Sequence, residues 1–324
     1  MAVVAGVAWL LWPRATDFER AAAMLPAETL RVTWTDWDSV RDEVGAEVGP
    51  DDMADELADR DLAVSSLLSS AERLEAGIGF SPVDAQWEIM GQSRDGLVVI
   101  LSFDDVASVA DGFAAAGWPR PGDDAMDGAV WQGSATTVND LGLTTFELTN
   151  VAFLADQGLL LASDQAPYLE SAVRVARGDA DGLDLSGLTA GAEPLVATAF
   201  AGDFACEALS MSSADDEARA VAASLVEQAG GVSPLTGYLV ALEPGSRIRI
   251  VFGFEDDDRA ERNLAPRRAL AGADDPGQGV DYRSLFTLAD AEADGHHVVL
   301  TGQADDRSYP LSNLTSGPVL LAAC

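Results

Sequence analysis

The sequence predicts an α+β fold made of two similar halves, each an antiparallel sheet with helices packed on it. Apolar strand-like runs follow one another as hairpins, with tight turns at 93–96 and 243–245. Amphipathic helical segments separate these hairpins instead of alternating with single strands, which excludes a Rossmann-type parallel sheet. A strand followed by acidic residues and a helix also occurs twice.

This repeated pattern predicts an internal duplication. Residues 97–103 (LVVILSF) match 248–254 (IRIVFGF) at alternate positions, which share one face of a strand. Acidic residues follow both runs, where they would cap the N-terminus of the next helix. Residues 28–37 match 193–204, and the hairpin at 146–163 matches the one at 285–302. We therefore expect an apolar anchor or signal remnant at 1–14, a first repeat at 15–180 and a second at 181–324.

The first half is expected to contain the following elements, in chain order. A strand at 30–36 leads into helical segments across 38–77, and strands at 85–93 and 97–103 form a hairpin. A helix at 104–117 has Val106, Val109 and Phe113 on one face, and these should be buried with Phe103. Strands at 128–134, 144–155 and 158–163 precede a helix at 166–177.

The second half repeats this order with shorter connections. We expect a strand at 194–200, a helix within 203–229, a hairpin at 236–254, a helix at 257–271 and a final hairpin at 283–303. Arg249 stands where the first half has an apolar residue, so the strand at 248–254 should be wetted on part of one face. All seven tryptophans precede residue 132, which predicts a heavier core in the first half. The alternative is a stacking platform for sugar or lipid.

The N-terminus carries eleven uncharged residues, 2–12 (AVVAGVAWLLW). This run is too short to span a membrane alone, and no basic segment precedes it as in a signal peptide. Three interpretations remain open: the outer end of an anchor, an unusual signal, and a buried helix. Trp9 and Trp12 favour the anchor, because tryptophan collects at membrane interfaces. We expect an extracytoplasmic protein, anchored to the membrane by its N-terminus or secreted.

The charge of the chain limits its partners. With 54 acidic residues and 19 basic ones, all of them arginine, the net charge is −35. Such a chain offers no basic footprint for a phosphate backbone, so nucleic acid is not an expected partner. Its 48% of hydrophobic residues can form a large core.

Motifs for catalysis, metals and nucleotides are weak, so we expect no enzyme and no cofactor. The only histidines, His296 and His297, are neighbours on a predicted hairpin and would point to opposite faces. Asp179, Asp181 and Asp184 resemble a calcium loop in composition but not in spacing. Asn313-Leu314-Thr315 matches a glycosylation sequon, a pattern that is common by chance.

One cluster of basic residues stands out in this acidic chain. Arg247, Arg249, Arg259, Arg262, Arg267 and Arg268 lie within 22 positions. They form a candidate surface patch for docking an anionic partner, such as an envelope protein, a wall polymer or a lipid headgroup. The alternative is that they neutralise the acids at 255–258 and around them.

The two cysteines, Cys206 and Cys324, are expected to form a disulfide. The count is even, and disulfides persist outside the cytoplasm. The apolar run 319–323 should lie against the body as a last strand or a buried tail, tied down by this bond. The alternative is two unrelated buried thiols.

Four features occur together in this chain: the apolar N-terminus, the strand opening Leu25-Pro26-Ala27-Glu28-Thr29, the duplicated body and the ending Ser316-Gly317-Pro318…Cys324. With them, the chain loosely resembles uncharacterised extracytoplasmic proteins of high-GC Gram-positive bacteria. The resemblance implies anchoring outside the membrane and no particular activity. The leading hypothesis is a non-enzymatic cell-envelope protein that binds a partner or envelope polymer. The alternative is a carrier with a cavity between sheet and helices for a lipid or other apolar ligand, and an enzyme is the third.

Overall fold

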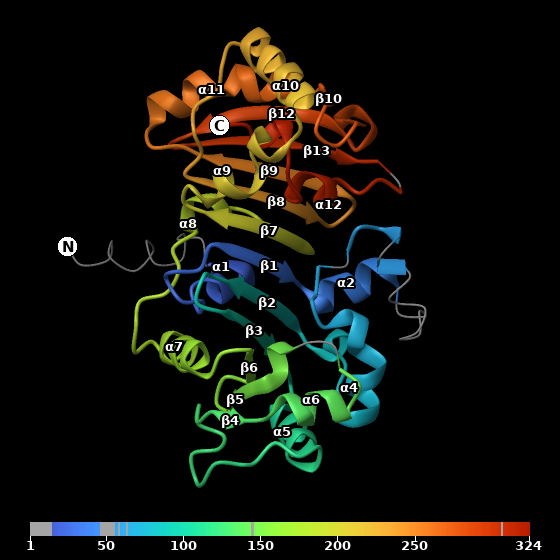
Figure 1. The fold of residues 1–324 in the computed structure, drawn as a ribbon, viewed down its shortest axis with the longest axis vertical. Coiled ribbons are helices and arrows are strands. Elements are labelled where there is room, and N and C mark those ends of the chain that lie inside the picture. The colour runs from blue at the N-terminus through green and yellow to red at the C-terminus, as the bar shows by residue number, and fades with distance from the viewer. Residues whose placement is uncertain (1–14, 46–55, 58, 63, 144–145, 306) are drawn as a thin grey trace, which may run out of the picture.

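Eleven antiparallel strands form one continuous sheet through the whole molecule, with helices on both faces (Figure 1). The structure is a computed structural model that describes residues 15–45, 56–57, 59–62, 64–143, 146–305 and 307–324. The predicted α+β class is confirmed. The predicted anchor at 1–14, with Trp9 and Trp12, lies outside the described residues.

The strands of the sheet follow the predicted hairpins closely. They are β1 (Arg31–Thr35), β2 (Trp87–Gln92), β3 (Leu97–Ser102), β4 (Trp131–Gln132), β5 (Asn150–Leu154), β6 (Leu159–Ser163), β7 (Val196–Ala201), β8 (Gly237–Glu243), β9 (Arg247–Gly253), β12 (Phe286–Asp294) and β13 (His297–Ala304). Their order in space is β12-β13-β9-β8-β7-β1-β2-β3-β6-β5-β4. A separate small hairpin, β10 (Asp274–Asp275) and β11 (Val280–Asp281), was not expected.

The helices also match most of the predicted segments. They are α1 (Asp17–Ala22), α2 (Trp37–Val44), α4 (Ala71–Gly77), α5 (Val106–Ala115), α6 (Ala135–Asp140), α7 (Ala166–Ala176), α8 (Ser186–Thr189), α9 (Phe204–Leu209), α10 (Asp216–Ala229), α11 (Asp257–Leu270) and α12 (Pro310–Thr315). The predicted strand at 144–155 is shorter than expected, because a 3₁₀ turn over Phe146–Thr149 precedes β5. Helices α6, α8 and α12 were missed.

The two halves meet at the centre of the sheet, where β1 pairs with β7. Outward from this pair the order is β1-β2-β3-β6-β5 on one side and β7-β8-β9-β13-β12 on the other. The matched strands β3 and β9 therefore occupy equivalent positions, and so do the two matched hairpins. The halves share one sheet instead of having one each, and their origin by duplication stays a prediction.

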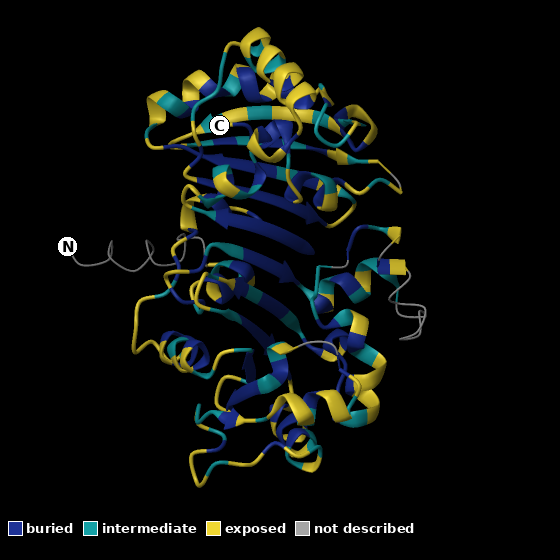
Figure 2. Cartoon of the chain, in the orientation of Figure 1, coloured by how far each residue is buried: buried dark blue, intermediate teal, exposed yellow. Residues whose placement is uncertain are grey.

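Each face of the sheet has its own apolar core, because successive strand residues point to opposite faces. In β3, Val99 and Leu101 join the first core, whereas Val98 and Ile100 join the second. Helices α2, α4, α5, α6 and α9 to α12 contribute to the first core, and α1, α7 and α8 to the second. Figure 2 shows the resulting pattern of buried strands under helices with exposed outer surfaces.

The predicted packing of α5 on the sheet is confirmed. Phe103, Val106, Val109 and Phe113 are all buried in the first core. Asp105 caps the helix by accepting a hydrogen bond from the Ser108 N–H at 3.1 Å. A Cβ added at Gly112 would lie 1.8 Å from the carbonyl oxygen of Ile78, so glycine permits the close approach of these two segments.

The tryptophans are mainly packing residues. Trp34, Trp37, Trp118 and Trp131 are each at most 1% exposed, so these four cannot form a surface platform for sugar or lipid. Trp87 is partly buried and stacks on Trp34, with ring centroids 5.6 Å apart. Burial of these large rings supports the prediction of a heavy first-half core.

Candidate functional site: an open face of the sheet

The disulfide between Cys206 and Cys324 is present, with 5.8 Å between the two Cα atoms. It joins α9, at the start of the second half, to the segment 319–324. Residues Val319 to Ala322 are fully buried, so the predicted buried tail is confirmed, as a 3₁₀ turn over Leu320–Ala322 and not as a strand. The bond thus closes a loop with a sequence separation of 118 residues.

Arg267 holds this tail from inside the protein. Its guanidinium donates to the carbonyl oxygens of Leu321 (2.7 Å), Ala323 (2.8 Å) and Ser233 (3.1 Å), and it lies 5.1 Å from the ring centroid of Phe252. Burial lowers the pKa of Arg267 to about 9. The prediction that Arg267 belongs to a surface patch is therefore wrong. Its side chain is fully buried because the apolar tail covers it and accepts hydrogen bonds from its two terminal nitrogens, whereas its Nε has no described partner.

A second clamp holds the tail through its backbone amides. One carboxylate oxygen of Asp275 accepts from the Tyr282 hydroxyl at 2.5 Å and from the Leu320 N–H at 2.9 Å. The same hydroxyl accepts from the Leu321 N–H at 3.1 Å. Burial raises the pKa of Tyr282 well above its usual range. Sequence reasoning missed this role of Asp275, because the contact with Leu320 spans 45 residues.

The remaining five arginines do not form one patch. Arg247 and Arg249 lie on β9 and point to the face opposite α11, since they alternate with Ile248 and Ile250 of the first core. Arg259 pairs with Glu255 (2.7 Å) and Asp256 (3.6 Å), as the neutralising alternative predicted. Arg262 and Arg268 are exposed on α11. Because the side chains of Arg247 and Arg249 point to the face of the sheet opposite α11, the six arginines cannot form one surface.

The face that carries Arg247 and Arg249 is an open part of the sheet. Direct cross-strand pairs place residues of β12, β13 and β9 in rows on this face. The rows are Glu292–Val299–Val251, Asp290–Thr301–Arg249 and Thr287–Gln303–Arg247. We call these nine residues the open face. All but Val251 are partly or fully exposed, which confirms that the strand predicted at 248–254 is wetted on part of one face.

The open face exists because one helix of the first half has no counterpart here. Helix α7 contacts β3, β5 and β6 and covers them (Figure 1). The strands in the equivalent positions are β9, β12 and β13. On their side of the sheet, the four-residue helix α8 packs on β9 and meets β13 at its first residue, His297. The segment after β13 instead forms α12 and the tail in the first core.

Charges on the open face are separated by strand. Glu243, at the end of β8, accepts from Arg249 Nε at 2.8 Å and lies 3.4 Å from Arg247 Nε, so one carboxylate offsets part of the charge of these two arginines. Asp290, Glu292 and Asp294 form an exposed acidic column along β12. None of these three forms an ion pair with a described residue. The outer rim of the surface is acidic, not basic as expected for an anionic partner.

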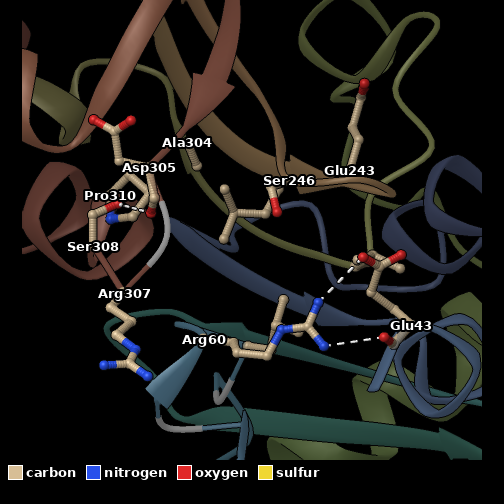
Figure 3. A pocket seen from close by; sticks show the side chains of 12 residues that line it. Glu43, Arg60, Glu243, Ser246, Ala304, Asp305, Arg307, Ser308 and Pro310 are labelled. Atoms are coloured by element: carbon tan, nitrogen blue, oxygen red, sulfur yellow. Dashed lines mark hydrogen bonds and ion pairs between the residues drawn. The ribbon is translucent and has the colours of Figure 1, made fainter. Parts of the chain in front are cut away.

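A small pocket adjoins this surface where the two halves meet (Figure 3). It has a volume of about 70 Å³ and is lined by both halves. Arg60 donates to the carbonyl oxygen of Glu43 at 3.0 Å and to its carboxylate at 3.2 Å, whereas Glu243 points away from this pair. The pocket is too small for a lipid or a drug-sized ligand, which needs about 300 Å³ or more.

A larger hollow is a surface groove between α10 and the tail. It measures about 790 Å³, and its lining includes Met211, Ala222, Val226 and Ala323 beside Cys324. No strand residue lines it. It is therefore not the cavity between sheet and helices that a carrier was expected to have.

A buried acid in the first half was missed by sequence reasoning. Glu88 on β2 is 2% exposed, and the Trp37 Nε1 donates to it at 3.4 Å. Burial raises the pKa of Glu88 to about 7. The signal available was a carboxylate inside the strand sequence WEIMGQ, but carboxylates are so abundant in this chain that one more carried little information.

The other singled-out residues lie apart from the open face or at its margin. His296 is exposed beside Asp257 (3.1 Å), and His297 starts β13 against α8, where partial burial lowers its pKa. Asn313 donates to the Tyr309 carbonyl oxygen within α12. In the described parts of the chain, no group of three His, Cys, Asp or Glu residues is placed to hold a metal, Asp179, Asp181 and Asp184 included. No described helix is long and apolar enough to cross a membrane.

Comparison of the chain with protein-family models, with curated proteins and with solved structures finds no match. The resemblance to extracytoplasmic proteins of high-GC Gram-positive bacteria therefore stays a prediction.

Proposed function

We propose that this chain is a non-enzymatic extracytoplasmic protein, held at the membrane by its N-terminus, that binds a partner protein through the open face. The observation that carries the proposal is that no described helix covers the outer strands β13 and β12 or the Arg247 end of β9 on this face. The equivalent strands of the first half are covered by α7, so the second half leaves a built polar surface free. An exposed strand surface with hydrogen-bonding side chains suits a protein partner better than a small molecule, which needs a concave site.

The disulfide supports the proposed compartment. Cytosolic thiols are kept reduced, whereas an oxidising compartment maintains a bond such as Cys206–Cys324. The strongly acidic surface fits a protein that stays soluble beside an anionic membrane without adhering to it. In the proposed arrangement, the chain preceding α1 tethers the body and the second half reaches the partner.

Site-specific photo-crosslinking tests this function in the cells that produce the protein. A photoreactive amino acid is placed at Thr301 on the open face and, as the matched control, at Ser224 on the exposed side of α10. We expect a discrete adduct from position 301 and none from position 224. Equal adducts from both positions, or none from position 301, would contradict the proposal.

The surface groove beside Cys324 favours a second candidate function, the binding of an apolar ligand. Its apolar lining and volume of about 790 Å³ would accept an acyl chain. Native mass spectrometry of protein purified from its own envelope tests this candidate. A retained mass in the range of a lipid supports it, and its loss in Ala222→Arg locates the site in the groove.

A further inference from the structure

Strand β12 is an edge of the large sheet, with no further strand beside it among the described residues. It pairs with β13 on one side, and the strand order ends there. With nine residues it is the longest strand described, whereas β4 at the opposite edge has two. A long exposed edge is a ready template for one more strand, and proteins normally shorten or cover such edges.

The backbone of β12 turns hydrogen-bonding groups outward along this edge. Asp294 pairs with His297 across a two-residue turn, so this closing pair is hydrogen-bonded between β12 and β13. The N–H and C=O groups of every second residue of β12 therefore point away from β13. Ala291 and Ala293 are these outward residues. The Ala291 N–H donates to the carboxylate of Asp290 at 2.8 Å, which confirms that it points away from β13.

The charges beside this edge determine what can pair with it. Asp290, Glu292 and Asp294 are exposed, and their direct partners on β13 are Thr301, Val299 and His297. No arginine lies in direct cross-strand contact with them, because Arg249 and Arg247 are one strand further and bound to Glu243. The column is therefore an uncompensated row of three carboxylates.

A second copy of this chain does not fit this edge. Antiparallel self-pairing would place one acidic column against the other, and like charges in cross-strand positions are destabilising. A strand with basic residues at every second position would instead meet each carboxylate with a cation. We infer that β12 takes up an extended, cationic segment of a partner protein as a twelfth strand. This inference rests on the proposed function and names the partner's chemistry.

A synthetic peptide tests the inference directly. The probe is an acetylated nine-residue peptide that alternates lysine with threonine or valine, and its reference is the same peptide with glutamate in place of lysine. We expect the lysine peptide to bind the full chain with at least tenfold higher affinity, measured by fluorescence anisotropy. The amides of Ala291 and Ala293 should gain protection from hydrogen exchange when it binds.

Two variants separate strand addition from general attraction to an acidic protein. Neutralising the column with Asp290→Asn, Glu292→Gln and Asp294→Asn should weaken binding at least tenfold. The matched control, Asp179→Asn, Asp181→Asn and Glu217→Gln, removes the same charge elsewhere and should change affinity less than twofold. Equal weakening by both triple variants would overturn the inference.

A backbone-modified peptide tests the hydrogen bonds without altering the protein. Methylating alternate amide nitrogens of the lysine peptide removes its donors and keeps its charge. Unchanged affinity of the methylated peptide would overturn strand addition. The crosslinking experiment distinguishes this failure from failure of the proposed function. If the adduct from position 301 persists after the acidic column is neutralised, the open face remains the interface. Only the role of β12 as the docking strand is then rejected.

Discussion

Phe113 shows how a single side chain organises the first core. It is fully buried, edge-on to Trp118 (centroids 5.0 Å apart) and to Phe153 (5.8 Å), and stacked on Phe80 (5.8 Å). Phe113→Ala should lower the free energy of unfolding by about 3–5 kcal/mol, because it removes these contacts and leaves a cavity. Denaturant titration measures this loss. Val221→Ala, at a site that is 46% exposed, is the control and should change stability by less than about 0.5 kcal/mol.

Glu88 makes stability depend on pH. Its pKa is raised from 4.5 to about 7 by burial, so between these values the folded state binds more protons than the unfolded state. Stability contributed by the neutral acid is full below pH 4.5 and is lost as pH rises to 7, by on the order of 3 kcal/mol. Urea titrations at pH 5, 6, 7 and 8 measure this slope.

The variant Glu88→Gln isolates this contribution from the repulsion among the many surface acids. It keeps the shape and a hydrogen-bond acceptor for Trp37 but cannot ionise. The difference in unfolding free energy between the two proteins should change across pH 5 to 7 and stay constant above pH 8. A constant difference over the whole range would mean that Glu88 ionises as an exposed acid does.

Arg267 tests whether the geometry of the guanidinium or its charge alone holds the tail. Arg267→Lys keeps a cation but cannot donate to three carbonyl oxygens in the same planar arrangement. We expect a loss of about 3 kcal/mol in unfolding free energy, in the range of hydrogen bonds made by charged groups. The neighbouring Arg268→Lys, at an exposed position, is the control and should leave the unfolding free energy unchanged in the same urea titration.

At the scale of elements, periodicity was informative wherever a strand or helix buries one face. The strand predicted at 97–103 is observed at Leu97–Ser102, and the helix predicted at 257–271 at Asp257–Leu270. Helix α12 escaped prediction because it depends on a distant residue: Asp61 accepts from the Ser312 N–H at 3.1 Å. The burial of Arg267 escaped for the same reason, since its partners lie 34 to 56 residues away.

The open face could be predicted only in part. Arg249 signalled a wetted strand, because a charged residue interrupts an apolar run. The extent of the surface depends on where α12 and the tail go after β13, and local sequence carries no such information. The acidic column could not be recognised in the sequence, because acidic residues are abundant throughout the chain. The alternation of Asp290, Glu292 and Asp294 with alanine differs little from other acidic stretches.

The disulfide should account for a large part of the stability of the second half. Closing a loop of this length is worth about 4–5 kcal/mol in the chain-entropy model. The double variant Cys206→Ser, Cys324→Ser should lose about this much in a denaturant titration. Thiol titration of the denatured, unreduced wild-type protein checks the bond independently and should find no free thiol. Two free thiols would contradict it.

At the scale of the whole molecule, the excess of negative charge should make stability sensitive to salt. A net charge of −35 destabilises the folded state by self-repulsion, which salt screens. The melting temperature should rise by on the order of 5 °C between 20 and 500 mM NaCl at pH 7. Near the pI of about 4.1 the rise should largely disappear, because the carboxylates are then partly protonated. A salt effect of the same size at both pH values would point to another cause.

The bond between Cys206 and Cys324 also has a consequence for survival among proteases. It encloses α10, α11 and the strands β8, β9, β12 and β13 in one covalent ring. The turns at Gly245 and Gly295, which are among the exposed sites of this ring, are natural places for a first cut. A single cut there opens the ring but detaches nothing, because both ends remain linked to the first half. A nicked molecule would keep its full mass until it is reduced, and the surface that we propose for partner binding would stay attached to its tether.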